Sequence, residues 1–170
     1  LTNYDDLDKF VEDLDFNEAG VIIFGPNDLR SRLMSSDYTN ASTLRGNYQN
    51  KMLNLISLNP KQLDDYLYYF PEDYDTYDKV ELLSRRVISS IFYYYQRVKV
   101  KKIYTDIPLH LRKVIHMVHQ LYELRCQQNE AGKNAAITHR VLKGYFHSLP
   151  NKHILEILTK HDKYIIDNDK

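Results

Sequence analysis

The amino-acid sequence predicts an all-α fold, a compact bundle of six to eight helices with at most one or two short strands. Apolar residues recur at the i, i+3, i+4, i+7 spacing of an amphipathic helix in most segments of the chain. Residues that favour helix starts stand at the expected boundaries, such as Asn59 before Pro60 and Asp106 shortly before Pro108. The composition, with 43% hydrophobic and 27% charged residues in 170, is that of a folded domain with a hydrophobic core.

The first 70 residues are expected to hold four helices and one short extended segment. The run Val21–Phe24, between Gly20 and Gly25, is a buried strand or an extended connector, and its length does not distinguish the two. Residues 35–47 are rich in Ser, Thr, Asn and Gly and are predicted to be a loop. The helices are expected at 4–15, from Asn27 or Asp28 through Leu33 and Met34, at 48–57, and from Pro60 to Phe70.

The rest of the chain is expected to contain four longer or better-marked helices. The acidic, tyrosine-rich residues 70–77 are predicted to be a second loop. The strongest helix begins near Thr76 or Asp78 and runs to about residue 97, where a basic connector, 97–102, follows. The next helix follows Pro108 and ends at the break of residues 129–134. The last two helices are expected near 135–147 and beyond Pro150.

We interpret residues 1–170 as one helical domain, a fragment of a longer protein, with a sub-boundary possible only at 70–77. A formal net charge of zero argues against a domain built wholly to bind nucleic acid, although a local basic patch remains compatible with it. No apolar stretch approaches the roughly 20 residues of a membrane span, so no membrane partner is expected. One cysteine allows no internal disulfide, and an intracellular location, nuclear or cytoplasmic, is the simpler expectation.

No familiar catalytic pattern stands in the sequence. It lacks a nucleophile elbow and both common glycine-rich nucleotide loops. His116 and His119 share a helix face, but a zinc site requires further ligands, so neither a metal nor a cofactor is expected. The chain is therefore predicted not to be an enzyme. An enzyme with a histidine-containing site is a second alternative, because all seven histidines follow residue 109.

The leading functional hypothesis rests on residues 66–77, which hold five tyrosines, one phenylalanine and several acidic residues. A helix has only one core face, so some of these rings are expected to face solvent, where tyrosine is favoured in interfaces. Such a surface suits a basic or amphipathic protein or peptide. We therefore predict a protein–protein interaction module that serves as an adaptor in a larger nuclear or cytoplasmic regulator. The alternative is a loop whose tyrosines cover the core edge. The candidate partner-binding residues are Tyr66, Tyr68, Tyr69, Asp73, Tyr74 and Tyr77.

The alternative functional hypothesis is single-stranded nucleic-acid binding by the central basic stretch. Tyrosines at 93–95 and 104 alternate with cations there, and single-strand binders use cations for phosphates and rings for bases. The competing interpretation is that Val98, Val100 and Ile103 pack inward while the lysines extend to solvent. The basic candidates in and beside this stretch are Arg97, Lys99, Lys101, Lys102, Arg112 and Lys113.

Residues 79–134 also resemble a family of single-stranded nucleic-acid-binding domains named for its Arg-x-x-x-His motif. The motif is matched by Arg112 and His116, on a helix preceded by a proline and followed by a loop with Gly132 and Lys133. The resemblance implies that Arg112 and His116 bind the single strand, and we add Lys113 and Lys133 as phosphate contacts. The sequence departs from the family after this loop, where residues 135–140 are predicted to be helical and not a basic strand.

Overall fold

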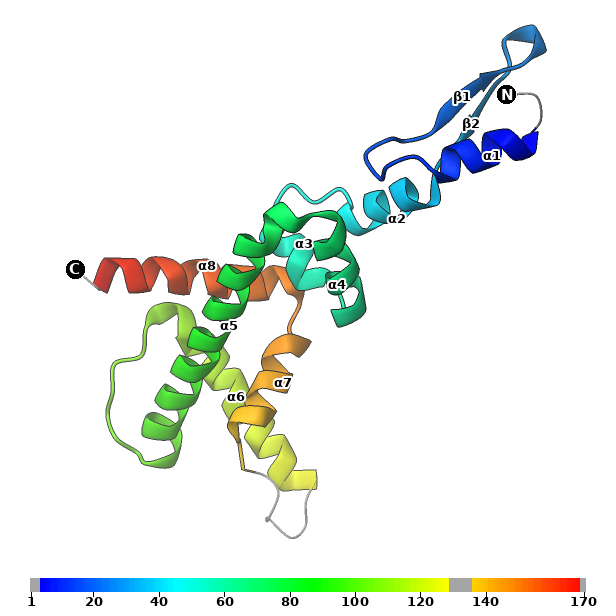
Figure 1. The fold of residues 1–170 in the computed structure, drawn as a ribbon. Coiled ribbons are helices and arrows are strands. Elements are labelled where there is room, and N and C mark those ends of the chain that lie inside the picture. Colours follow the sequence, from blue (N-terminus) through cyan, green and yellow to red (C-terminus); the bar gives the residue numbers. More distant parts are fainter. Residues whose placement is uncertain (1–3, 129–135, 169–170) are drawn as a thin grey trace. The chain divides into compact units, whose positions relative to one another are not determined.

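The computed structural model describes residues 4–128 and 136–168 (Figure 1). Within these residues it contains eight α-helices and one two-stranded antiparallel sheet, which confirms the all-α prediction. No described helix combines the length and apolar character needed to cross a membrane. The helices are α1 (Tyr4–Glu12), α2 (Ser36–Arg45), α3 (Lys51–Ser57), α4 (Pro60–Tyr69), α5 (Tyr74–Tyr95), α6 (Leu109–Gln128), α7 (His139–Ser148) and α8 (Asn151–Asn168), and the strands are β1 (Val21–Phe24) and β2 (Arg30–Leu33).

The chain divides into two compact units, Leu1–Asp75 and Thr76–Lys170, here called the first and the second unit. The division lies within residues 70–77. It also separates the charges, since the first unit has 14 acidic and 6 basic residues and the second has 9 acidic and 17 basic ones. The formal net charges are therefore −8 and +8, and the zero net charge of the whole chain conceals two strongly charged units.

A β-hairpin occupies the place where a helix through Leu33 and Met34 was expected, so that prediction was wrong. β1 and β2 pair antiparallel from Val21 opposite Leu33 to Phe24 opposite Arg30, and a short 3-10 turn joins them. Gly20 precedes the hairpin with a positive φ of 121°, a conformation that side chains rarely adopt. The glycines and Pro26 disfavour a helix here, and strand pairing then satisfies the backbone.

Helix α2 corrects the loop prediction for residues 35–47. The Ser35 hydroxyl caps the helix by accepting a hydrogen bond from the Tyr38 N–H at 3.0 Å. Gly46, with φ 55°, ends the helix, and its N–H donates to the Ser42 carbonyl. Ala41 is the only α2 residue that is buried, so the helix carries almost no apolar stripe to reveal it. The expected cap of α4 is confirmed, because Asn59 and Gln62 form a reciprocal capping box.

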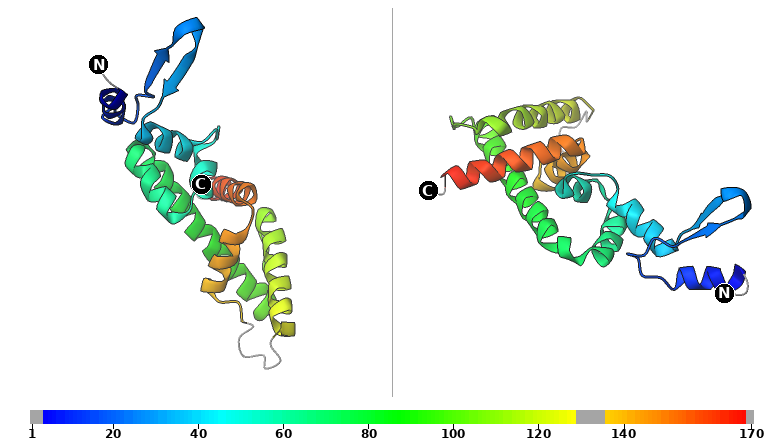
Figure 2. Two further views of the ribbon diagram at one scale, coloured as in Figure 1. Left: turned by 90° about the vertical axis from the view of Figure 1, so that its right-hand side faces the viewer. Right: turned by 90° about the horizontal axis from the view of Figure 1, so that it is seen from above.

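Helices α5 to α8 form the second unit around one apolar core. Its fully buried side chains come from all four helices, with Val87, Leu111, Phe146 and Leu158 among them. In Figures 1 and 2, α8 crosses α5 instead of running along it. The start of α5 at Tyr74, after a 3-10 turn at Pro71–Asp73, shows that residues 70–77 are mostly helical and not a loop. α7 begins at His139, after an extended N-cap at Thr138.

The basic connector also differs from expectation, because Gln96–Val100 continues α5 as a π-helix. The wider turn is closed by the Lys101 N–H donating to the Gln96 carbonyl at 2.9 Å. Lys102 then takes a positive φ of 57° and ends the helical segment. π-helical segments are rare, and as single-turn bulges in α-helices they are frequent at functional sites.

Candidate nucleic-acid interface

One face of α5 and its π-helical extension forms a surface pocket of about 300 Å³ in the second unit, here called the α5 pocket. Successive members of this face are spaced at i, i+3, i+4, i+7 and i+8, as one side of a helix requires. The opposite face of α5, with Val87, Ile88 and Ile91, is buried in the core. The pocket is lined by Ser89, Phe92, Tyr93, Gln96, Arg97, Lys101 and His139, and this lining contains no carboxylate.

Arg97 is held in place within this pocket. Its Nε donates to the Thr105 hydroxyl at 3.1 Å, and its guanidinium carbon lies 5.5 Å from the centroid of the Tyr93 ring. Tyr93 also contacts Tyr94 edge to face, with the ring centroids 5.2 Å apart, and it is 51% exposed, so part of its ring is accessible to a ligand. A guanidinium stacked on an exposed ring is already arranged to contact a phosphate and a base together.

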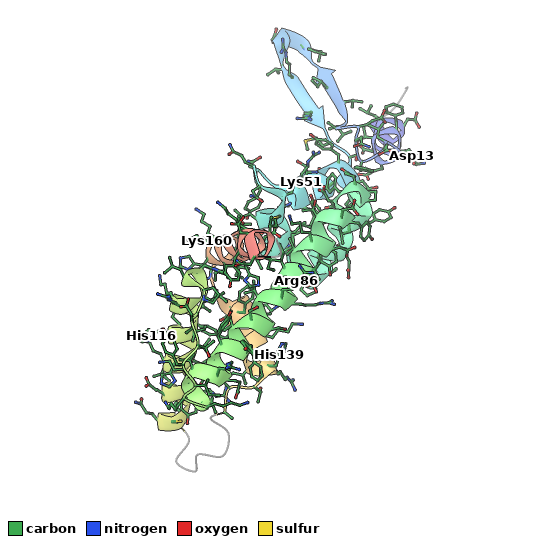
Figure 3. The ribbon with its side chains drawn as sticks, turned by 90° about the vertical axis from the view of Figure 1, so that its left-hand side faces the viewer. Asp13, Lys51, Arg86, His116, His139 and Lys160 are labelled. Carbon is green, nitrogen blue, oxygen red and sulfur yellow. The ribbon has the colours of Figure 1, made fainter. Side chains whose placement is uncertain are left out.

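The far wall of the pocket comes from α7. The His139 ring lies 5.9 Å from that of Phe92, edge to face. Figure 3 places His139 beside α5, whereas His116 projects from α6 on the opposite side of the view. The pocket therefore combines three rings, two cations and the Gln96 amide, and these groups suit a polyanion with aromatic bases.

The remaining predicted basic residues do not gather at this pocket. Lys99 is half-buried, and Lys102 is exposed. Arg112 donates to the Ile107 carbonyl at 2.9 Å and pairs with Asp106 at 3.1 Å, so its charge already has a partner. Lys113 lines a different pocket, and His116 is exposed on α6. Lys133 lies outside the described residues.

The tyrosines of the basic stretch also have separate environments. Tyr95 is only 3% exposed, and burial, followed by the charges of nearby groups, raises its pKa to about 12. Tyr94 is half-buried, and burial is the main cause of its raised pKa. Tyr93 and Tyr104 are exposed. The predicted inward packing of Val98, Val100 and Ile103 holds only in part, because Val98 is half-buried whereas Val100 and Ile103 are exposed.

Tyr66 and Asp73 were predicted to bind a partner, but both side chains are buried and so are not accessible to one. The Tyr66 hydroxyl donates to the Asp73 carboxylate at 2.6 Å, and burial together with this bond raises the pKa of Tyr66 to about 12. Burial alone would raise the pKa of Asp73, but hydrogen bonds from Lys51 and Tyr66 outweigh it and lower that pKa. Lys51 lies 2.5 Å from the carboxylate. These residues stabilise the first unit from inside.

The other members of the tyrosine set differ in exposure. Tyr68 is 80% exposed and Tyr74 is 51% exposed. Tyr69 is half-buried, and its hydroxyl donates to Asp37 at 3.2 Å. Tyr77 is half-buried and belongs to the second unit. The predicted partner surface is thus reduced to Tyr68 and Tyr74 as freely accessible rings.

Three helices of the second unit bring a serine and two histidines together. Nε2 of His110 lies 3.0 Å from Nδ1 of His161, and Nε2 of His161 lies 3.5 Å from the Ser90 hydroxyl. Burial and then the charges of His110 and Arg86 lower the pKa of His161 to about 4. Burial and the charge of Lys160 lower the pKa of His110. When both imidazoles are neutral, the N–H of one can donate to the unprotonated nitrogen of the other. The hydrogen bond between His110 and His161 can therefore form at neutral pH.

The described residues contain no group of three or more His, Cys, Asp and Glu side chains suited to a metal ion. Comparisons of the chain with models of protein families, with characterised proteins and with solved structures find no match.

Sequence reasoning identified Arg97 and Lys101 but missed Phe92, Gln96 and His139. A helical spacing that runs through Ser89, Phe92, Tyr93, Gln96 and Arg97 was present in the sequence. This stripe mixes polar, aromatic and charged residues, so a search for apolar periodicity passes over it. No sequence signal linked His139 to α5, because their proximity arises from packing alone.

Proposed function

We propose that the second unit binds single-stranded nucleic acid at the α5 pocket. The observation that carries the proposal is a lining of three rings and two cations without a carboxylate. The net charge of +8 supports it, since counterion release from phosphates needs an excess of basic residues. The proposal includes a nuclear or cytoplasmic location, where such strands occur.

The proposed contacts differ from those that the Arg-x-x-x-His family implies. Arg97 and Lys101 would contact phosphates, while Phe92, Tyr93 and His139 would offer ring faces to bases. Arg112 is a weaker candidate, because it already pairs with Asp106 and donates to the Ile107 carbonyl. The family resemblance thus remains a separate hypothesis that can be tested against the pocket.

The test is fluorescence anisotropy of a labelled oligothymidylate with the full chain, at about 50 and about 200 mM salt. We expect Tyr93→Ala to weaken binding about tenfold, as the loss of one stacked base requires. Lys101→Ala should reduce the slope of log affinity against log salt by about 0.7. Lys61→Ala, which removes an exposed lysine of α4, is the matched control and should leave binding unchanged.

Two results would overturn the proposal. One is the lack of saturable binding by wild type at the lower salt concentration. The other is a loss of binding in Arg112→Ala while Tyr93→Ala and Lys101→Ala bind as wild type. That second pattern would place the strand on α6 and favour the Arg-x-x-x-His interpretation.

We propose protein binding by the first unit as a second candidate function. The exposed rings of Tyr68 and Tyr74 favour it, together with the net charge of −8, which suits a basic amphipathic peptide. Calorimetric titration with such a peptide should lose its signal in Tyr68→Ala and keep it in Tyr104→Ala, a control at another exposed ring. Equal affinities of the two variants would contradict this candidate.

A further inference from the structure

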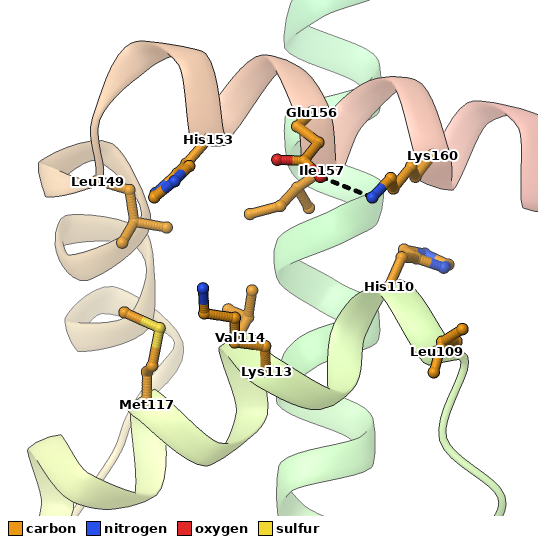
Figure 4. Close-up of a pocket in the computed structure, with 10 residues that line it drawn as sticks. All are labelled: Leu109, His110, Lys113, Val114, Met117, Leu149, His153, Glu156, Ile157 and Lys160. Carbon is orange, nitrogen blue, oxygen red and sulfur yellow. Dashed lines mark hydrogen bonds and ion pairs between the residues drawn. The ribbon is translucent and has the colours of Figure 1, made fainter.

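A second pocket of the second unit, here called the α6–α8 pocket, has a volume of about 230 Å³ and an apolar floor (Figure 4). The floor consists of Val114 and Met117 from α6, Leu149 from the end of α7, and Ile157 from α8. Val114, Leu149 and Ile157 are buried, so the floor belongs to the packed core. Such a floor favours an apolar ligand body, because contact removes hydrocarbon from water on both sides.

Basic side chains surround this floor. Lys113 projects from α6 toward α8, and Lys160 and His153 stand on α8 opposite it (Figure 4). Glu156 is the only carboxylate of the lining, and Lys160 donates to it at 2.6 Å. Lys113 makes no ion pair with a described carboxylate, although its charge acts on Glu156. The lining thus holds two ammonium groups and one carboxylate, so the rim is positively charged.

His110 closes one end of the pocket. Its Nε2 is engaged by His161 at 3.0 Å, so the ring has a fixed position. An organic cation is disfavoured, because it would be repelled by Lys113 and Lys160 and the single carboxylate of the lining is already paired. A neutral apolar molecule would leave the charge of Lys113 without a partner. An apolar body with one negative head group satisfies both the floor and the rim.

We propose that the α6–α8 pocket binds a small amphipathic anion, an apolar body that carries a single carboxylate. Its apolar part lies on Met117 and Ile157, and its carboxylate pairs with Lys113. This site shares no lining residue with the α5 pocket, so the inference does not depend on nucleic-acid binding.

The methionine methyl groups offer a direct test in the full chain. The chain has three methionines, of which Met117 lines the pocket while Met34 and Met52 belong to the first unit. In a chain labelled with ¹³C at these methyl groups, sodium octanoate should shift the Met117 resonance to saturation and leave the other two in place. Octylammonium, of equal chain length and opposite charge, should cause no saturable shift. Met117→Leu assigns the resonance.

A pair of lysine variants tests the head group. Lys113→Gln should raise the Kd for octanoate about fivefold, the effect of losing an ion pair at a partly exposed site. Lys143→Gln, at an exposed lysine of α7 outside the pocket, should leave the Kd unchanged. The proposal is overturned if all three methyl groups respond alike, if octylammonium binds as well as octanoate, or if the two lysine variants have the same Kd.

Discussion

Acidification from neutral pH is expected to destabilise the second unit through His161. This side chain is 3% exposed, and burial and the charges of His110 and Arg86 lower its pKa to about 4. Asp162 acts in the opposite direction but does not reverse the shift. Because the unfolded chain binds a proton at His161 near pH 6.5 and the folded chain does not, stability falls as the pH drops below 6.5 and continues to fall toward pH 4.

The magnitude follows from the two pKa values. Between about pH 7 and about pH 5 the unfolded imidazole becomes protonated while the folded one stays neutral, which costs about 2 kcal/mol of unfolding free energy. The lowered pKa of His110 adds a loss of the same sign. A change of this size is a large part of the stability of a domain, which is of the order of 5–15 kcal/mol.

The assay is urea unfolding followed by far-UV circular dichroism at about pH 7 and about pH 5. The quantity compared is the loss of unfolding free energy between the two pH values, which subtracts any effect of the substitution that is independent of pH. In His161→Gln this loss should be about 2 kcal/mol smaller than in wild type, because the amide does not titrate. His116→Gln, at an exposed histidine of α6, should show the wild-type loss.

A direct measurement in the wild-type chain removes any dependence on the variant. The imidazole resonance of His161, followed by NMR, should titrate near pH 4. A midpoint near 6.5, or an equal loss of stability in His161→Gln and wild type, would refute the argument from burial.

Two further predictions concern the first unit and α7. Tyr66→Phe should lower the unfolding free energy by about 1–3 kcal/mol in urea titrations, because it removes a donor from the buried Asp73 carboxylate, whereas Tyr68→Phe, at an exposed ring, should have no effect. Gly20→Ala should weaken the hairpin, because the added methyl group would overlap a backbone carbonyl oxygen of β2. Gly144→Ala should instead raise the melting temperature, because the added methyl group has open space in α7 and alanine favours the helix. Equal effects of the two tyrosine variants, or of the two glycine variants, would contradict these expectations.

The elements that the sequence predicted well are those whose signals lie within a few residues. The Asn59 cap, the start of α6 after Pro108 and the apolar stripe of α5 are all local patterns. Helix α2 was not predicted because it buries only Ala41, and without an apolar stripe its capping residues look like those of a polar loop. The hairpin was not predicted because the pairing of β1 with β2 joins residues up to twelve positions apart, whereas the spacing of Leu33 and Met34 fits a helix locally.

The candidate site could be predicted only in part. The basic stretch was visible, and it supplied Arg97 and Lys101 to the α5 pocket. Arg112 looked equally suitable, yet Asp106 holds it, and no pattern distinguishes a free arginine from a paired one. The net charge of the whole chain does not reveal the basic second unit, because the opposite charges of the two units cancel in the sum.

The sequence by itself determined that this chain is helical, where most helices begin and end, and which residues are available for chemistry. Backbone hydrogen bonds, caps and helical periodicity involve neighbours in the chain, so they can be read without a structure. Only the tertiary structure decided that Tyr66 is buried on Asp73, that His110 meets His161, and that His139 completes the α5 pocket. Burial and charge pairing depend on residues brought together from distant segments by packing, and no local pattern records those contacts.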